Sequence, residues 1–135
     1  ILMFQKEVAD RIISNHNNSN YGRLSIISQW KLNIEKIFDI KPTSFQPKPK
    51  VDSTLLVLTP KNNYENICSE KSLEKVTRIF FNQRRKKIKK PINQIFENNS
   101  KIIEKLNLNM DLRPQNLDIK TFCKIASEYN SLLLD

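Results

Sequence analysis

Apolar residues in the first part of the chain follow strand and helix patterns in turn. Residues 1–5 form an apolar run that predicts a short strand buried on both faces, as in parallel sheets. In residues 6–13 the apolar side chains fall on one helical face, and a similar pattern runs through residues 24–32. Residues 33–40 fit either a strand or a longer helix, and we favour a strand because a proline-rich segment and another strand follow. Three apolar side chains of that strand would point inward: Ile34, Phe38 and Ile40.

The proline-rich segment at residues 44–50 leads into a second apolar run at residues 51–59. Alternate prolines favour extended backbone, so the segment is predicted to be a stiff rod without ladder hydrogen bonds. The apolar run predicts a buried strand. Its connection to residues 33–40 is too short for a parallel crossover, so these two strands should be antiparallel. The rod would hold Phe45 either as a flat surface for a nucleic-acid base or as a plug of the core.

A polar stretch at residues 61–69 precedes a part in which every pattern is helical. Helical spacing recurs at residues 73–80, 102–106 and 119–133, and Asp118 is placed to cap the last helix. The basic stretch, residues 84–90, contains six cations in seven positions. Apolar residues at helical spacing pass through it, which predicts a helix whose cations surround a buried stripe: Phe81, Ile88, Ile92 and Ile95. Pro91 then predicts a kink or the start of a new helix.

The charge of the chain favours a polyanionic partner. The 135 residues carry a net charge of +9, and 39% of them are hydrophobic, which allows a packed core and excludes wholesale disorder. Residues 1–60 hold 8 basic and 5 acidic residues, net +3, and residues 61–135 hold 15 and 9, net +6. Nucleic acid comes ahead of a membrane surface, because no basic amphipathic anchor stands out.

The two cysteines and the hydropathy pattern limit the compartment. Cys68 and Cys123 lack a CxxC spacing and a neighbouring histidine, which predicts reduced thiols in a cytoplasmic protein, with neither a disulfide nor a metal site. No apolar run approaches the roughly 18 residues of a membrane span, so we expect no membrane contact. We also expect the chain to be a monomer. The chain opens on an apolar run without an initiator methionine. We therefore expect it to be the C-terminal portion of a longer protein.

The basic stretch allows more than one use. A run of cations serves as a solvated face or a sorting signal about as readily as it binds nucleic acid. Nucleic acid is favoured here because apolar residues anchor the cations to a folded surface. Arg84 and Arg85 can grip a phosphate with two hydrogen bonds each, whereas the lysines act as point charges.

With these motifs in order, the chain resembles the C-terminal half of the bacterial small-subunit ribosomal RNA adenine dimethyltransferases (the KsgA type). The resemblance runs nearly from end to end. It rests on five segments: FQKEVADRI at 4–12, YGRLSIISQW at 21–30, FDIKPTSFQPKPKVDS at 38–53, FNQRRKKI at 81–88 and LRPQNLDIKTFCKIA at 112–126. The proline-rich element is shared with the methyltransferases that confer macrolide resistance by modifying large-subunit rRNA. YGRLS and FNQRRK favour the small-subunit enzyme.

The resemblance implies an α/β fold. Residues 1–62 would be the C-terminal part of a class I, Rossmann-like, S-adenosylmethionine-dependent methyltransferase domain, with its last three strands and the final one antiparallel. Residues 63–135 would be a small all-helical rRNA-binding domain. The implied reaction transfers methyl groups to two adjacent adenines of small-subunit rRNA, with Phe45 stacking on the target adenine. The candidate RNA contacts are Lys48, Lys50, Arg84, Arg85, Lys86, Lys87, Lys89 and Lys90.

The chain departs from the family pattern where the cofactor binds. The glycine-rich loop, the acidic residue for the ribose and the Asn-Leu-Pro-Tyr element are absent, and one glycine cannot make a GxGxG motif. We therefore expect no cofactor-binding residue here and no activity from this chain alone. Two alternatives stay open: a non-enzymatic rRNA-binding or ribosome-assembly module from a truncated or split gene, and a relative recruited as a mitochondrial transcription factor.

Overall fold

The computed structural model describes residues 1–134, in which three strands form one sheet and helices pack beside it. The strands are β1 (Leu2–Gln5), β2 (Leu32–Ile40) and β3 (Ser53–Pro60). β3 lies between the other two and is antiparallel to both. The prediction of a strand at residues 33–40, antiparallel to the next strand, is therefore confirmed.

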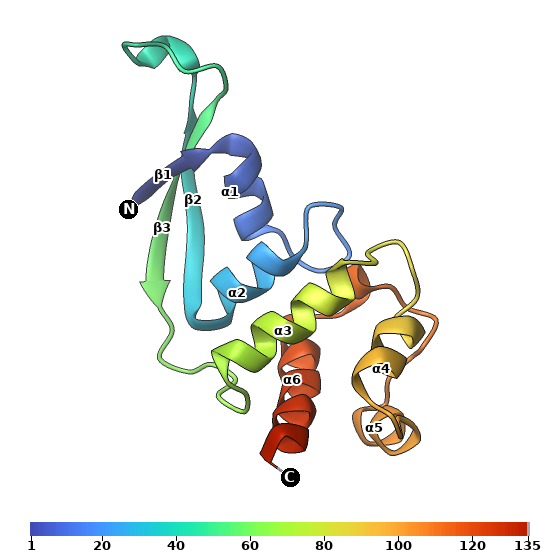
Figure 1. The fold of residues 1–135 in the computed structure, drawn as a ribbon. Coiled ribbons are helices and arrows are strands. Elements are labelled where there is room, and N and C mark those ends of the chain that lie inside the picture. The colour runs from blue at the N-terminus through green and yellow to red at the C-terminus, as the bar shows by residue number, and fades with distance from the viewer. Residues whose placement is uncertain (135) are drawn as a thin grey trace.

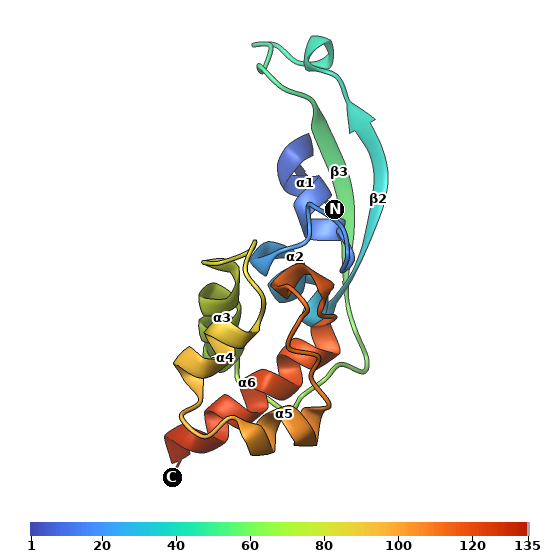
Figure 2. The ribbon, with the colours of Figure 1, turned by 90° about the vertical axis from the view of Figure 1, so that its right-hand side faces the viewer.

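Two helices follow the predicted patterns closely. These are α1 (Lys6–Ile13) and α2 (Arg23–Lys31). α1 lies against one face of the sheet, where Ala9 and Ile12 pack with Leu56 in a small core. In Figure 2 both helices lie on the same side of the long β2–β3 ribbon.

The opposite face of the sheet is open to solvent. Met3 on this face is 52% exposed, and Leu2, which pairs with Leu56 and points to the α1 face, is 54% exposed. The prediction that residues 1–5 form a strand buried on both faces is therefore wrong for this structure. Phe38, predicted to point inward, is 52% exposed. A β-bulge between Lys36 and Phe38 explains this, because one extra residue reverses the alternation and pairs Phe38 with Leu55 on the outer face. Ile34 and Ile40 are half-buried.

The second part of the chain is helical, as predicted. Its helices are α3 (Glu70–Phe81), α4 (Lys89–Ile95), α5 (Ser100–Leu106) and α6 (Ile119–Leu134). α3 and α6 pack side by side, with the rings of Phe80 and Phe122 5.5 Å apart. The predicted cap of α6 is present, because the Thr121 amide donates to Asp118 Oδ1 at 2.8 Å.

The core of the helical part also takes in side chains that precede the polar boundary. Tyr21, Ile26 and Trp30 are buried in the same cluster as the α3 and α6 residues. The Trp30 indole N–H donates to the Glu65 carbonyl at 2.7 Å, which ties α2 to the stretch that leads into α3. α2 is therefore the element that joins the sheet to the helices.

The basic stretch is not a continuous helix. α3 ends at Phe81, residues 82–88 form a turn, and α4 begins at Lys89. The alternative of a new helix near Pro91 is confirmed, with the proline in the first turn of α4, where its missing N–H has no intrahelical partner to lose.

The proline-rich segment forms the tip of the β2–β3 hairpin, which projects away from the helices in both views (Figures 1 and 2). It is not the straight rod that the prolines predict. A short 3₁₀ turn at Pro42–Ser44 precedes Phe45, bends follow, and the Gln46–Pro47 peptide bond is cis. As predicted, the strand ladder skips this segment and resumes at Ser53. Within residues 1–134, no helix has the length and apolar character of a membrane span.

Candidate nucleic-acid interface

Five cations are displayed together where α3 gives way to α4. Arg85, Lys86 and Lys87 are exposed on the turn, and Lys89 and Lys90 are exposed at the start of α4. We call the segment 82–88 the basic turn. Its Lys87 makes an ion pair with Asp111 at 3.1 Å, with both side chains largely in solvent.

Ile88 anchors the basic turn to the helical core. Its side chain is fully buried, and its amide donates to the Leu112 carbonyl at 2.8 Å. The cations on either side of Ile88 are therefore held on an ordered surface. Sequence reasoning expected such a surface from the apolar spacing but assigned it to a helix.

Arg84 behaves differently from the other cations. Its side chain is half-buried, its guanidinium donates to the Ser19 carbonyl, and the same group lies over the ring of Phe81, 5.9 Å from the centroid. The structure thus brings Arg84 together with the loop between α1 and α2, a contact that no sequence pattern indicated.

A polar cleft opens beside Arg84. Its volume is about 410 Å³, and it is lined by Arg11, Ser19, Asn20, Gly22, Arg23, Leu24, Phe81 and Arg84. Sequence reasoning missed Arg11 and Arg23. Arg11 pairs with Glu7 at 2.9 Å and Arg23 lies 4.0 Å from Glu74, but both arginines remain about half exposed. Three guanidinium groups around one cleft make it suited to an anion such as a phosphate. The available signal was the placement of Arg11 in the last turn of α1, on its polar face.

The hairpin tip presents the other predicted site residues. Phe45 is half-buried and its amide donates to the Pro42 carbonyl at 3.2 Å, while Lys48 and Lys50 are exposed. The Phe45 side chain is therefore neither fully exposed nor part of a hydrophobic core. In Figure 1 the tip projects at one end of the molecule, whereas the turn between α3 and α4 lies near its middle, so the structure does not gather these candidates into one pocket.

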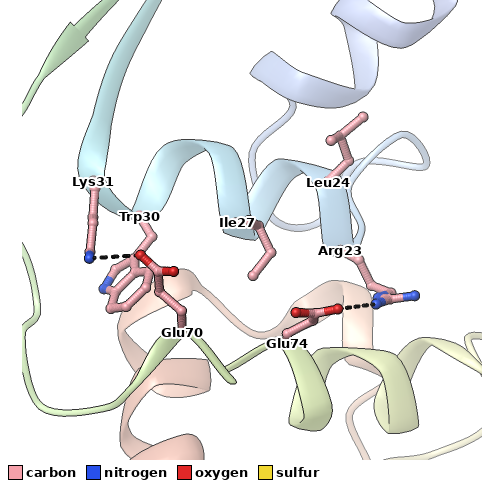
Figure 3. A pocket seen from close by; sticks show the side chains of 7 residues that line it. All are labelled: Arg23, Leu24, Ile27, Trp30, Lys31, Glu70 and Glu74. Carbon is pink, nitrogen blue, oxygen red and sulfur yellow. Dashed lines mark hydrogen bonds and ion pairs between the residues drawn. The ribbon is translucent and has the colours of Figure 1, made fainter. Parts of the chain in front are cut away.

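An apolar groove of about 520 Å³ runs between α2 and the first turns of α3 (Figure 3). Leu24 and Ile27 are 42% and 40% exposed on its wall, and Trp30 forms its floor at one end. Two ion pairs border it, Arg23 with Glu74 and Lys31 with Glu70, the second at 3.2 Å. Two basic and two acidic side chains line the groove, so it holds no excess of positive charge, whereas the lining of the cleft beside Arg84 contains three arginines and no acid.

Cys68 and Cys123 are free thiols buried near each other in the helical core. A hydrogen bond between them lowers the pKa of Cys68 and raises that of Cys123. Residues 1–134 contain no cluster of three or more histidine, cysteine or acidic side chains placed to hold a metal ion. The thiol pair therefore lacks further ligands around it.

The family description "Ribosomal RNA adenine dimethylase" matches residues 1–131 of this chain. The chain belongs to the ribosomal RNA adenine dimethylase family. This membership confirms the resemblance seen in the five sequence segments.

Curated members of the dimethylase family are close in sequence. Ribosomal RNA small subunit methyltransferase A of Pelagibacter ubique is 60% identical over 132 residues, which cover 98% of this chain and 50% of that protein. The protein of the same name from Ehrlichia ruminantium is 47% identical over 128 residues, covering 93% and 48%. The chain therefore spans about half the length of the curated relatives it matches.

Solved structures place the dimethylase chain in the α/β methyltransferase fold. A dimethyladenosine transferase from Plasmodium falciparum superposes with a TM-score of 0.81 at 28% identity, over 96% of this chain and 56% of that one. The 23S rRNA methyltransferase ErmE superposes with a TM-score of 0.57 at 14% identity, over 95% and 53%, and at that identity supports the fold alone.

The family implies S-adenosylmethionine as the methyl donor, and the residues of this chain do not fit that cofactor. Gly22 is the only glycine, so the chain has no glycine-rich turn that would let the backbone approach the ligand closely. The cleft at the start of α2 is lined by arginines, whose charge opposes a sulfonium cation. We assign no cofactor contact to these residues.

Proposed function

We propose that this chain is the RNA-holding part of an adenine dimethyltransferase that acts on small-subunit ribosomal RNA in the cytoplasm. One observation carries the proposal: a chain of this family displays five exposed cations around a buried anchor, Ile88. An ordered cationic turn can meet successive phosphates without losing much side-chain and backbone freedom on binding.

Two parts divide the work in this proposal. Residues 1–62 form the C-terminal portion of the catalytic domain, with β1, β2 and β3 as its last three strands. Residues 63–135 form the small helical domain that grips rRNA. The antiparallel placement of β3 between β1 and β2 supports the first assignment, and the basic turn supports the second. The chain acts as a monomer.

The RNA path runs along the basic turn and into the cleft beside it. Arg85, Lys86, Lys87, Lys89 and Lys90 neutralise phosphates on the turn, and Arg11 and Arg23 extend that positive surface across the α1–α2 loop. Nucleic-acid contacts of this kind are sequence-independent and set position rather than specificity.

The hairpin tip presents the target base. Phe45 stacks on the extruded adenine, and Lys48 and Lys50 hold the phosphates next to it. The half-buried state of Phe45 supports this role, because part of the side chain stays accessible to a base. S-adenosylmethionine supplies the methyl group in the complete enzyme and is held by none of the residues described here.

Binding to an rRNA hairpin tests the proposal directly. Fluorescence anisotropy of this chain with a hairpin from the 3′ end of small-subunit rRNA is measured across a range of KCl concentrations. Changing Arg85 and Lys86 to Ala should lower the log–log salt slope by about 1.4–1.8, since each lost phosphate contact removes about 0.7–0.9.

A matched control removes two exposed lysines from the far end of α3. Lys71 and Lys75 are exposed and one helical turn apart, so their change to Ala alters the net charge equally without touching the basic turn. The control should retain nearly the parent slope. Equal slopes for both double variants would count against the basic turn as the RNA contact.

A non-enzymatic rRNA-binding module is the second candidate. The observation that favours it is the single glycine, which leaves the chain without a cofactor turn. Titration calorimetry with S-adenosylmethionine tests what the two candidates have in common, which is that this chain does not hold the cofactor, and the methylation assay on a complete enzyme separates them. Both candidates predict no heat of binding to this chain, so a measurable heat would overturn the assignment of the cofactor site to other residues.

A further inference from the structure

Arg84 lies in the middle of the basic stretch but makes two contacts inside the protein. Its Nη2 donates to the Ser19 carbonyl, 65 positions earlier in the chain, and its guanidinium covers the Phe81 ring at 5.9 Å. Its neighbours Arg85 and Lys86 point into solvent. Because the guanidinium of Arg84 already donates at its edge and packs its face on a ring, it has fewer free N–H donors for a phosphate.

The ring beneath Arg84 is itself fixed. Phe81 meets Tyr21 edge-on at 6.2 Å and lies 5.7 Å from Phe122 of α6. Tyr21 is buried and donates to the Leu117 carbonyl at 2.7 Å. Arg84 therefore packs on a cluster of aromatic side chains that belongs to the helical core, and hydrogen-bonds from there to the α1–α2 loop.

The middle of the same loop also contacts the helical part. The Asn17 amide donates to the Gln115 carbonyl at 2.7 Å, and Asn116 Nδ2 donates to Asn17 Oδ1 at 3.0 Å. Residues 14–20, a polar segment without helix or strand, are thus hydrogen-bonded to the helical part at Asn17 and Ser19, and to Gln29 of α2 at Ser14. Arg84 provides the tie on the side of the basic turn.

We infer that Arg84 is a positioning residue that clamps the α1–α2 loop to the basic turn, and that the phosphate contacts belong to its neighbours. The clamp keeps Arg11 and Arg23, which flank the loop, in line with Arg85 and Lys86. An arginine is needed because its planar group can stack on a ring and donate in its plane together, which a lysine cannot do. The inference rests on the proposed RNA contact, but the contact between Arg84 and the α1–α2 loop can be measured without RNA.

The amide hydrogen-exchange rates of residues 14–20, measured without RNA, test whether Arg84 holds the α1–α2 loop in place. Both Arg84→Ala and Arg84→Lys should speed exchange of this segment by about fivefold or more, because loss of a tie favours local opening. Arg85→Ala is the matched control and should leave exchange unchanged. Parent-like exchange in both Arg84 variants would overturn the inference. Circular dichroism and the melting midpoint establish that each variant is folded.

The affinity for the rRNA hairpin tests the consequence of the clamp for RNA binding. Arg84→Lys keeps the charge and should still weaken binding about tenfold, nearly as much as Arg84→Ala, whereas Arg85→Lys should stay within about threefold of the parent. Parent-like affinity in Arg84→Lys would overturn the positioning role. Failure of the parent chain to bind the hairpin would instead refute the proposed function, while the exchange experiment would still decide the clamp.

Discussion

Tyr21 shows how a single side chain joins the two parts of the molecule. It lies just before α2, its hydroxyl donates to Leu117, and burial raises its pKa well above the ordinary value, so it stays a neutral donor. Its partner is 96 positions away. Sequence reasoning could not find this bond or that of Arg84, because the acceptors are backbone carbonyls, which every residue carries.

Phe45 is the residue on which the proposed chemistry most depends. A chimera in which this chain replaces the matched half of the Pelagibacter ubique relative provides the assay. Phe45→Ala in that chimera should lower the rate of rRNA methylation by about 5- to 150-fold, because base stacking contributes about 1–3 kcal/mol. The ring is at the hairpin tip, outside both hydrophobic cores, so the melting midpoint should change little.

Phe45→Leu is the matched control for size and apolar character. It keeps a side chain on the hairpin but offers no aromatic face, so its methylation should fall nearly as far as that of Phe45→Ala. A large drop in the melting midpoint with an unchanged rate would instead restore the view that Phe45 plugs the fold.

At the scale of elements, the sequence predicted those helices and strands that show a regular spacing of apolar residues. α1 was found to the residue because its apolar side chains share one face, and α2 was found within one residue from the three-residue steps between Leu24, Ile27 and Trp30, although Leu24 and Ile27 stay partly exposed. The basic turn was mistaken for helix because Phe81 and Ile88 are seven positions apart, a spacing that two helical turns and a compact turn between helices share. The bulge in β2 was missed because an extra residue leaves no mark in the composition of a strand.

Asp39 links β2 to its neighbours and gives the hairpin a pH dependence. A hydrogen bond from Thr54 at 2.6 Å, followed by one from Lys36, holds the pKa of Asp39 below its ordinary value. A carboxyl group whose pKa is lower in the folded state than in the unfolded state stabilises the fold above the unfolded pKa, about 3.9. That stabilisation is lost as the pH falls through the folded-state pKa. Thr54→Val should therefore lower the melting midpoint at pH 7, and the gap from the parent should narrow below about pH 3.9.

The melting midpoints of parent and Thr54→Val are compared at matched ionic strength between neutral and acid pH. Thr59→Val, a similar change at an exposed position of the same strand, serves as the control and should show no such narrowing. A constant gap across the whole range would mean that the Thr54 contact does not act through the Asp39 carboxylate.

At the scale of the whole molecule, α2 connects two hydrophobic cores, because it contributes side chains to the helical core and also contacts α1 and β2. The sheet core contains Ala9, Ile12 and Leu56, and the helical core takes in Ile26 and Trp30 from α2. Composition predicted the basic character, and the pattern of apolar positions predicted strands with helices followed by helices alone. It could not predict the bare outer face of the sheet, because apolar strand residues look the same whether or not another layer covers them.

Methylation by the unmodified chimera tests the central claim most directly. Purified chimera, S-adenosylmethionine and small ribosomal subunits lacking the modification are combined, and the rRNA is digested for mass spectrometry. The account predicts two adjacent dimethylated adenines near the 3′ end of the rRNA, at a rate comparable with that of the Pelagibacter protein. A folded chimera that binds S-adenosylmethionine but leaves those adenines unmodified would contradict it.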